Sequence, residues 1–537
     1  MKAASEAASE ATRSPLLPLT IRELIDRRVA QDPSFVYCRF GEQALTLGEF
    51  DRRVNSFANG LLALGLKRGD RVAVMLPNHP DYVVAFLAAA RIGVCQVPVN
   101  INLRGTGLAY VLEHSKLRGL IIDVRFAQQV MPVLKRGTVE IIIGRGGIVG
   151  ADFGDATTFE VVLQRGAPSK PPIVTRQDDV LLISYTSGTT GVPKGVLVTD
   201  RMLQACGYAA TALADVRPGD VFYLWEPIYH IAGCEVLIAA LLERVTLALA
   251  ERFSVSRFWS DVRVYKATHI HFFGGVLGLL LKEPPGPGDR DHCVRIAWGG
   301  GCPISIWTKF QDRFGVRIRE CYGMTEASSF TTLNTDEKIG SIGKPLPYFE
   351  VRIADDDGRF LGPGQKGEIW VKEKVAGVIM TGYFGNPEAT VSALQGGWLR
   401  TGDLGYSDAE GFYYFAGRKK DSLRRRGENI SAWEVERVLN EHPAVAESAV
   451  IGVDNETSDQ DIKAFLRLKL GERLDALELI KWCEPRMAPF QIPRYVAFIE
   501  EFPKTPTERI RKELLPRATD GCFDLEKSGY RLIRTVK

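Results

Sequence analysis

Residues 184–195, SYTSGTTGVPKG, gather hydroxyl side chains, glycines and one lysine directly after the apolar run 180–183. Glycine lets the backbone turn successive N–H groups toward one point, the hydroxyls add donors, and Lys194 adds a mobile positive charge, which together suit a polyphosphate. The segment is not the Walker pattern, because Gly195 follows the lysine and 196–198 reads as a second strand. We therefore expect a strand, a phosphate loop and a strand, and the alternative is a flexible turn rich in hydroxyls. The candidate phosphate ligands are Thr186, Ser187, Gly188, Thr189, Thr190, Gly191 and Lys194.

The composition is typical of a large globular protein. A chain of 537 residues with 45% hydrophobic content can bury a large core and is long enough for two to four domains. Lysine and arginine (68) nearly cancel aspartate and glutamate (65), so we expect neither a nucleic acid nor a membrane as partner. The nine cysteines form no CxxC pair, and no apolar run approaches membrane-spanning length. These features favour a reducing compartment without structural zinc and predict a cytoplasmic protein, with residues 1–19 as a disordered tail.

Helix and strand patterns alternate along the first half of the chain. Capping boxes at Thr20–Glu23 and Thr46–Glu49 mark two helix starts. A strand over 71–76, a helix over 80–92 and a strand over 95–99 form a βαβ crossover, and further strands are expected at 119–123 and 139–143. The alternation predicts the α/β class, in layers built on parallel sheet, with ligands at the carboxyl ends of the strands.

The pattern changes in the second half. Short strands and Gly/Pro turns around 355–370 indicate a small β-rich subdomain. The charged stretch KKDSLRRRGENIS after Arg418 marks a domain boundary, and a compact α+β unit follows, opened by a capped helix at Ser431–Glu434. We expect an N-terminal domain of residues 20–418, a hinge at 419–422 and a C-terminal domain of 423–537.

Two further motifs carry groups that suit a nucleotide. CYGMTEAS at 321–328 follows WGGGCP at 298–303, so that the glycines allow close approach to a flat ligand and Tyr322 offers an aromatic face. Thr325 and Glu326 supply oxygen ligands of the kind that Mg²⁺ prefers. TGDLG at 401–405 places Asp403 on a tight turn, where a carboxylate can accept both hydroxyls of a ribose. Taken singly, TGDLG is more often an ordinary β-turn.

The motifs YTSGTTGVPKG, PIYH, GGGCP, YGMTE, TGDLG and GRKKD occur in this order along the chain. In this ordered set the sequence resembles the adenylate-forming superfamily, which includes the acyl-CoA synthetases, from about Thr20 to Leu515. The resemblance implies a large N-terminal AMP-binding domain, a small mobile C-terminal domain, and ATP, Mg²⁺ and CoA as cofactors. It implies an enzyme that condenses a small carboxylic acid with ATP to acyl-AMP, releases pyrophosphate and passes the acyl group to the thiol of CoA.

The resemblance also implies roles for single positions. A lone histidine is more often structural, and only the motif PIYH makes His230 a candidate. The implied contacts are Gly301, Cys302, Pro303, Tyr322 and Gly323 with adenine, Asp403 and Arg418 with ribose, Thr325 with the α-phosphate, Glu326 and Thr186 with Mg²⁺, His230 with the acyl entrance, Lys420 as the hinge and Gly427 at the pantetheine tunnel.

One departure from the family pattern concerns its last motif, close to PxTxxGK, whose lysine bridges the substrate carboxylate and the α-phosphate. Residues 503–511 read PKTPTERIR, with Glu508 at the glycine position and Arg509 at the lysine position. Arginine keeps the charge but is bulkier and planar, so the exchange is not conservative. We predict that Arg509 does the work of the lysine. Lys504 and Lys512 are alternatives, but a helical register from Thr507 would point Lys512 away from that role.

The acid itself is less well defined by the sequence. RRRGENIS with PKTPT resembles the carnitine- and crotonobetaine-type CoA ligases, which supports CoA as the acceptor. The expected acyl pocket draws on 228–234, 271–278 and 297–300, where aromatic side chains and glycines would admit an aromatic or a small to medium aliphatic acid. Two alternatives stay open: an adenylating enzyme that loads a carrier protein, and a nucleotide-binding protein with impaired catalysis.

Overall fold

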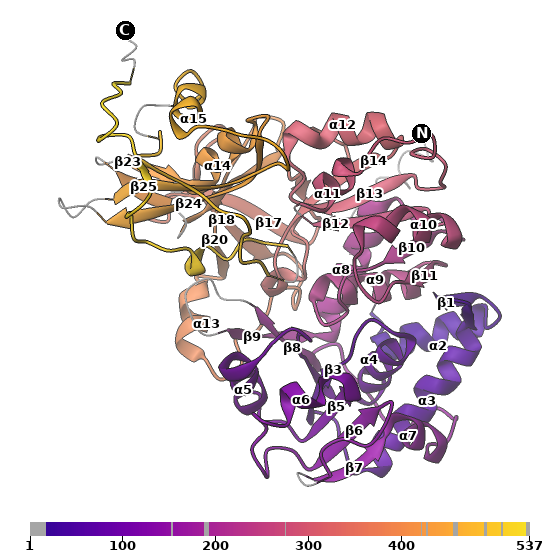
Figure 1. Cartoon of the computed structure of the whole chain (residues 1–537). Coiled ribbons are helices and arrows are strands. Elements are labelled where there is room, and N and C mark those ends of the chain that lie inside the picture. Colours follow the sequence, from indigo (N-terminus) through magenta and orange to yellow (C-terminus); the bar gives the residue numbers. More distant parts are fainter. Residues whose placement is uncertain are drawn as a thin grey trace.

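The computed structural model describes residues 18–151, 154–186, 193–273, 275–419, 422–425, 428–454, 460–487, 491–505 and 508–532. Two large sheets with helices between and outside them form the main body, and a five-stranded sheet and a C-terminal region lie against it (Figure 1). The predicted α/β class is confirmed. None of the helices in these ranges is long and apolar enough to cross a bilayer. The tail expected at 1–19 lies almost wholly outside the described residues.

The first sheet has seven strands in the order β7-β6-β5-β3-β4-β8-β9, and all neighbours are parallel except β8 and β9. Three of the predicted strands are confirmed, but the one expected at 139–143 begins two residues later, because pairing with β5 starts at Ile141. The strands are β3 (Arg71–Met75), β4 (Cys95–Pro98), β5 (Gly119–Asp123), β6 (Ile141–Arg145), β7 (Asp155–Thr158), β8 (Val180–Thr186) and β9 (Lys194–Thr199).

The second sheet has nine strands in the order β16-β15-β14-β13-β12-β10-β11-β1-β2. Its centre, from β14 to β1, is parallel, and both edges are antiparallel. The strands are β1 (Val36–Phe40), β2 (Gln43–Thr46), β10 (Val221–Leu224), β11 (Thr246–Leu249), β12 (His269–Phe273), β13 (Ile296–Gly300), β14 (Arg317–Tyr322), β15 (Thr332–Asn334) and β16 (Lys344–Pro345).

Helices form three layers around the two sheets (Figure 1). Those between the sheets include two that are buried on nearly all sides and are mostly apolar, as expected of a helix covered on both faces. The capping boxes at Thr20–Glu23 and Thr46–Glu49 and the helix over 80–92 are confirmed. The inner helices are α2 (Ile21–Gln31), α3 (Leu47–Ala63), α4 (Pro80–Ile92), α8 (Asp200–Ala214) and α9 (Ile231–Leu242); α7 (Phe159–Arg165) packs on α3; the outer helices are α5 (Gly105–His114) and α6 (Ala127–Val130) on the first sheet, and α10 (Val255–Tyr265), α11 (Val276–Lys282) and α12 (Ile304–Phe314) on the second.

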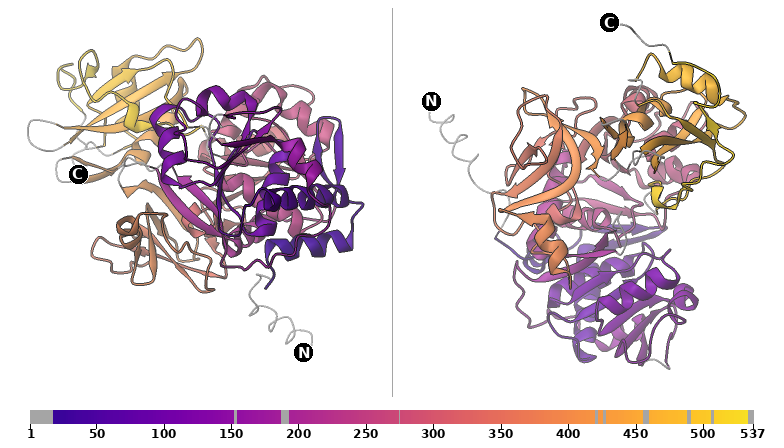
Figure 2. Two further views of the ribbon diagram at one scale, coloured as in Figure 1. Left: turned by 90° about the horizontal axis from the view of Figure 1, so that it is seen from below. Right: turned by 90° about the vertical axis from the view of Figure 1, so that its left-hand side faces the viewer.

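Two smaller units complete the chain, and Figure 2 shows them as separate bodies against the main one. The β-rich subdomain and the α+β unit are both confirmed, and β21 ends at Arg418 while β22 begins at Ser422. The domain limits and the hinge stay predictions. The first unit comprises β17 (Phe349–Ala354), β18 (Gly367–Glu373), α13 (Pro387–Ala393), β19 (Leu394–Gln395), β20 (Trp398–Ser407) and β21 (Tyr413–Arg418); the second comprises β22 (Ser422–Arg425), β23 (Glu428–Ser431), α14 (Ala432–Asn440), β24 (Val445–Asp454), β25 (Gln460–Leu468), α15 (Ala476–Cys483), β26 (Tyr495–Phe498) and β27 (Phe523–Asp524).

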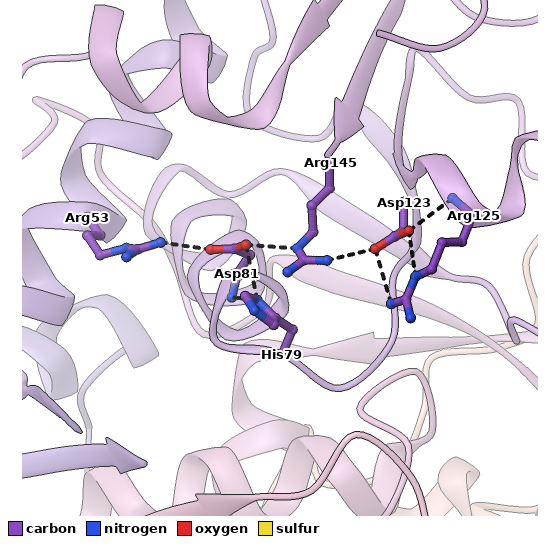
Figure 3. Close-up of polar contacts among 6 residues, drawn as sticks. All are labelled: Arg53, His79, Asp81, Asp123, Arg125 and Arg145. Carbon is purple, nitrogen blue, oxygen red and sulfur yellow. Dashed lines mark hydrogen bonds and ion pairs between the residues drawn. The ribbon is translucent and has the colours of Figure 1, made fainter. Parts of the chain in front are cut away.

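A chain of alternating charges ties the first sheet to its helices (Figure 3). Asp81, in the first turn of α4, lies 2.7 Å from Arg53 of α3 and 2.8 Å from Arg145 at the end of β6. Arg145 continues to Asp123 at the end of β5 (2.7 Å), which also binds Arg125 (2.9 Å). Because each carboxylate meets two guanidinium groups, the network fixes the carboxyl ends of two strands more firmly than isolated pairs would.

Candidate active site

The predicted phosphate loop joins two paired strands at the carboxyl end of β8. Thr186 ends β8 and is the register partner of Lys194, which begins β9, so the strand, loop and strand order is confirmed. The Thr186 hydroxyl lies 3.5 Å from the Lys194 carbonyl oxygen. The other predicted ligands, Ser187, Gly188, Thr189, Thr190 and Gly191, lie outside the described residues.

A tyrosine links this hairpin to the YGMTE motif. The Lys194 ammonium nitrogen lies 5.0 Å from the centre of the Tyr383 ring, and the Tyr383 hydroxyl donates to Glu326 Oε1 at 2.9 Å. Tyr383 is held in place by an antiparallel bridge to Val196 in β9. Burial raises the pKa of the Glu326 carboxyl, so a nearby cation would favour its ionised form. Thr325 and Glu326 share a buried 3₁₀ turn, Thr325–Ala327.

A second group brings together three predicted ligands of the nucleoside. The Tyr322 hydroxyl donates to Asp403 Oδ2 at 2.9 Å, and Arg418 Nε lies 3.2 Å from Asp403 Oδ1. The prediction that Asp403 sits on a tight turn is wrong. It lies within β20, where it pairs with Arg418 of β21, because Gly402 takes a left-handed φ of 70° and a register shift at Leu404 lets the strand continue.

The loop predicted to hold adenine leaves the end of β13 and enters α12. Its Gly301 and Cys302 N–H groups donate to Glu320 Oε1 at 2.8 and 3.1 Å, and Pro303 caps the helix. Glu320 is buried in the neighbouring strand β14, and this burial raises its pKa to about 8. Gly323 is required here, since a Cβ would lie 2.1 Å from the Ser329 carbonyl oxygen.

His230 stands at the start of α9, close to the end of β12. It caps the N-terminus of α9, and its ring centre is 6.2 Å from that of Phe273 at the end of β12. The His230 side chain is exposed. Loss of solvation, with a smaller effect of His271, lowers its pKa to about 4, so the ring is neutral at pH 7.

Of the predicted residues Lys420, Gly427 and Arg509, only Arg509 belongs to the part of the chain that the structure describes. Arg509 lies in a turn of the C-terminal unit, where its N–H donates to the Thr505 hydroxyl at 3.1 Å. The helical register assumed from Thr507 is wrong: Lys504 and Ile510 form an antiparallel bridge, because Glu508 takes a left-handed φ of 61° and reverses the chain. Lys420 and Gly427 lie outside the described residues.

Sequence reasoning missed several buried acidic groups and Tyr383. Glu235 is the only charged residue of α9, IAGCEVLIAALL, and a lone acid in an apolar helix is a signal that could have found it. Glu320 lies in β14, RIRECY, directly after Arg319, so the sequence around it gives no such signal. Tyr383 carries no such signal, because its significance depends on contacts with segments far away in the chain.

The donor set suits Mg²⁺ held jointly with a nucleotide. Among the described residues no group of three or more His, Cys, Asp or Glu side chains could hold an ion alone. Mg²⁺ is commonly bound by one or two carboxylates together with substrate phosphates. Glu326 offers the buried carboxylate and the hairpin of Lys194 lies beside it, so the residues present fit the ion.

Residues 25–384 match the AMP-binding enzyme family, and residues 434–509 match the AMP-binding enzyme C-terminal domain. The chain belongs to this family of AMP-binding enzymes. It is 32% identical over 493 residues to a crotonobetaine/carnitine–CoA ligase of Salmonella arizonae, covering 90% of this chain and 95% of that one. A homologue of that name from Escherichia coli strain SE11 is 33% identical, with 87% and 92% covered.

Solved structures of AMP-binding enzymes share this fold. The o-succinylbenzoate CoA synthetase of Bacillus subtilis with its acyl-adenylate superposes with a TM-score of 0.80 at 28% identity, covering 92% of this chain and 98% of that one. A benzoate CoA ligase from Burkholderia xenovorans gives 0.82 at 25% identity, with 92% and 99% covered. The resemblance stated from the motifs is therefore confirmed, and the α/β architecture with it.

Proposed function

We propose that this AMP-binding enzyme is an ATP-dependent acid–CoA ligase that works through an acyl-AMP. One observation carries the proposal: the Lys194–Tyr383–Glu326 group joins the phosphate hairpin to the YGMTE motif, and the Tyr322–Asp403–Arg418 group follows directly from the same motif. One group suits phosphates and the other a nucleoside. ATP, Mg²⁺ and CoA are the small molecules that its family uses with a carboxylic acid.

Activation is needed because a thiol does not displace oxide from a carboxylate. Joining the acid to AMP supplies a good leaving group, and the transfer depends on positioning and charge neutralisation rather than on a protein nucleophile. Mg²⁺, when bound, would neutralise phosphate charge beside Glu326. Asp403 keeps lone pairs that can accept the ribose hydroxyls while Tyr322 and Arg418 orient it.

The remaining roles follow the same scheme. The hydroxyl and glycine residues from Thr186 to Gly191 would bind the β- and γ-phosphates, Gly301 to Pro303 with Gly323 would border adenine, and Thr325 would contact the α-phosphate. Because Arg509 stands in the C-terminal unit, it would reach the reacting carboxylate only after that unit rotates about Lys420. The opposite rotation would bring Gly427 to the pantetheine tunnel.

The relatives and structural neighbours are named for two kinds of acid. The named acids include crotonobetaine and carnitine on one side and o-succinylbenzoate and benzoate on the other. The glycines and aromatic side chains near His230 and Phe273 support a small to medium acid in this chain.

A panel of carboxylic acids assayed for AMP release, with and without CoA, tests the function. The ligase releases AMP and forms a thioester only when acid, ATP and free CoA are all present. Pyrophosphate exchange without thioester formation from free CoA would instead support a carrier-protein acceptor. Tight ATP binding without exchange for any acid would support a nucleotide-binding protein that lacks catalysis.

A further inference from the structure

The turn at 325–329 carries two of the predicted ligands, Thr325 and Glu326, and its backbone is strained. Ser328 and Ser329 both take a left-handed φ, of 53° and 65°. Glycine visits that region routinely, whereas a residue with a side chain meets a steric cost there. The turn therefore depends on its surroundings to keep this shape.

One neighbour of the turn is the segment 377–384, called here the strap, which follows β18. The Ser328 hydroxyl donates to the Val378 carbonyl oxygen at 2.6 Å. The Met380 N–H donates to the Glu326 carbonyl oxygen at 2.8 Å. The strap thus holds the main chain at Glu326 and the side chain of one of the two strained residues.

The strap also pairs with the phosphate hairpin. The Phe384 N–H donates to the Gly195 carbonyl oxygen at 2.7 Å, and Tyr383 forms the antiparallel bridge to Val196. The Tyr383 hydroxyl reaches back to the Glu326 carboxylate. A displaced strap would therefore move the hairpin and the turn relative to each other.

A single carboxylate oxygen fixes the start of the strap. Glu373 Oε2, at the end of β18, accepts three successive backbone N–H groups. The donors are Gly377, Val378 and Ile379, at 3.0, 3.2 and 3.2 Å. Successive N–H groups that converge in this way bind an anion, and their bonds to an ionised acceptor are stronger than those to a neutral one. Val378 is fully buried, so water could not replace Glu373 as the acceptor of its N–H.

We infer that Glu373 is a positioning residue for adenylation, which acts through Val378 and Ser328 to hold Thr325 and Glu326 in place for the α-phosphate and Mg²⁺. The inference rests on the proposed acid–CoA ligase activity and adds to it a residue that contacts no ligand. Removing a group that orients the ligands of a metal commonly lowers metal affinity or activity about ten- to a hundredfold. Because acyl-AMP and CoA react after pyrophosphate has left, the effect should fall mainly on adenylation.

Variants of Glu373 test this division between the half-reactions. Glu373→Ala removes the acceptor, so we expect pyrophosphate exchange at saturating ATP to slow about tenfold or more, with thioester formation from preformed acyl-AMP near the parent rate. Glu373→Gln keeps an oxygen for the three N–H groups and should recover most of the exchange. Glu388→Ala, which removes an exposed carboxylate on α13 of the same unit, is the control and should match the parent. Equal losses in both half-reactions of Glu373→Ala would overturn the inference.

Equilibrium binding gives a readout that does not depend on turnover. ATP binding to the parent and to Glu373→Ala is measured by calorimetry without any acid, once with Mg²⁺ and once with EDTA. The gain in affinity that Mg²⁺ confers should shrink about tenfold or more in the variant, while the affinity in EDTA stays near that of the parent. A merely structural loop would lower the melting temperature or both affinities alike and leave the gain unchanged, which would overturn the inference.

A double-mutant cycle tests whether Glu373 acts through Ser328. Ser328→Ala removes the hydrogen bond to Val378 and leaves the strained backbone, so it should slow exchange as Glu373→Ala does. Because both changes break one chain of contacts, the double variant should lose no more than the slower single variant. Losses that multiply would overturn the inference. If Glu373→Ala does not fold, Ser328→Ala must by itself reduce the gain in affinity from Mg²⁺.

The outcomes separate this inference from the proposed function. A Glu373→Ala variant that matches the parent in exchange and in the gain from Mg²⁺ keeps the ligase and rejects the role of Glu373. A parent that shows no exchange with any acid rejects the ligase, and the binding measurement alone then decides the role of Glu373.

Discussion

Replacing Glu320 separates the cost of burying a carboxyl group from the benefit of holding the loop from Gly301 to Pro303, which is predicted to border adenine. Its Oε1 accepts two backbone N–H groups, and burial raises its pKa from 4.5 to about 8. Because the folded value lies above the unfolded one, the stability that this group contributes is complete below pH 4.5 and is lost as the pH rises toward 8. The loss is about 1.4 kcal/mol per pH unit and approaches about 4 kcal/mol at pH 8.

Glu320→Gln keeps an oxygen for both N–H groups but cannot ionise. Urea unfolding should find the variant near the parent at pH 5 and more stable at pH 8, by an amount that approaches the same 4 kcal/mol. Glu320→Leu removes the acceptor and leaves two N–H groups unpaired, which costs about 1–3 kcal/mol each, and it should raise the KM for ATP in pyrophosphate exchange. The reasoning would be refuted if the stability of the Gln variant relative to the parent did not rise between pH 5 and pH 8. It would also be refuted if the Leu variant were as stable as the Gln variant.

Three further changes probe other parts of the account. Asp403→Asn removes the charge that faces Arg418 and should lower kcat/KM for ATP about tenfold or more in pyrophosphate exchange, with the KM for the acid nearly constant; an unchanged value would argue against the ribose role. Arg509→Ala should slow pyrophosphate exchange about a hundred- to a thousandfold and leave thioester formation from preformed acyl-AMP near the parent rate, while Arg509→Lys retains exchange; equal loss in both half-reactions would contradict this. Burial raises the pKa of Asp81, but the hydrogen bonds from His79 and Arg145 with their charges outweigh it and lower the pKa to about 2. The stability that Asp81 contributes is therefore present above pH 4 and is lost as the pH falls through 2. Asp81→Asn should cost about 2 kcal/mol at pH 7 in urea unfolding and less at pH 2.

Much of the α/β body could be predicted from local patterns. The helix over 80–92 carries proline at its start, glycine at its end and apolar residues throughout, so its limits follow from the sequence. The starts of the helices after Thr20 and Thr46 could be predicted likewise, because each capping box is formed by residues that are close in the chain. These features depend on neighbours in the chain, which is why no tertiary information was needed.

The site was predictable only where a motif is contiguous. Thr325 and Glu326 are adjacent in the sequence, but Tyr383, which joins Glu326 to Lys194, comes from a segment 57 residues further on. Asp403 was assigned to a turn because Thr-Gly-Asp is usually one, whereas pairing with Arg418 extends the strand through it. Glu508 reverses the chain before Arg509, which a helical extrapolation could not anticipate.

The central claim is that the acid passes through an acyl-AMP before it meets CoA. An acid labelled with heavy oxygen in both carboxylate positions, incubated with ATP and CoA, tests it most directly. The account predicts that AMP carries one heavy oxygen in its phosphate while pyrophosphate carries none, because the carboxylate oxygen stays with the leaving group. Heavy oxygen in inorganic phosphate, with ADP as the nucleotide product, would contradict it.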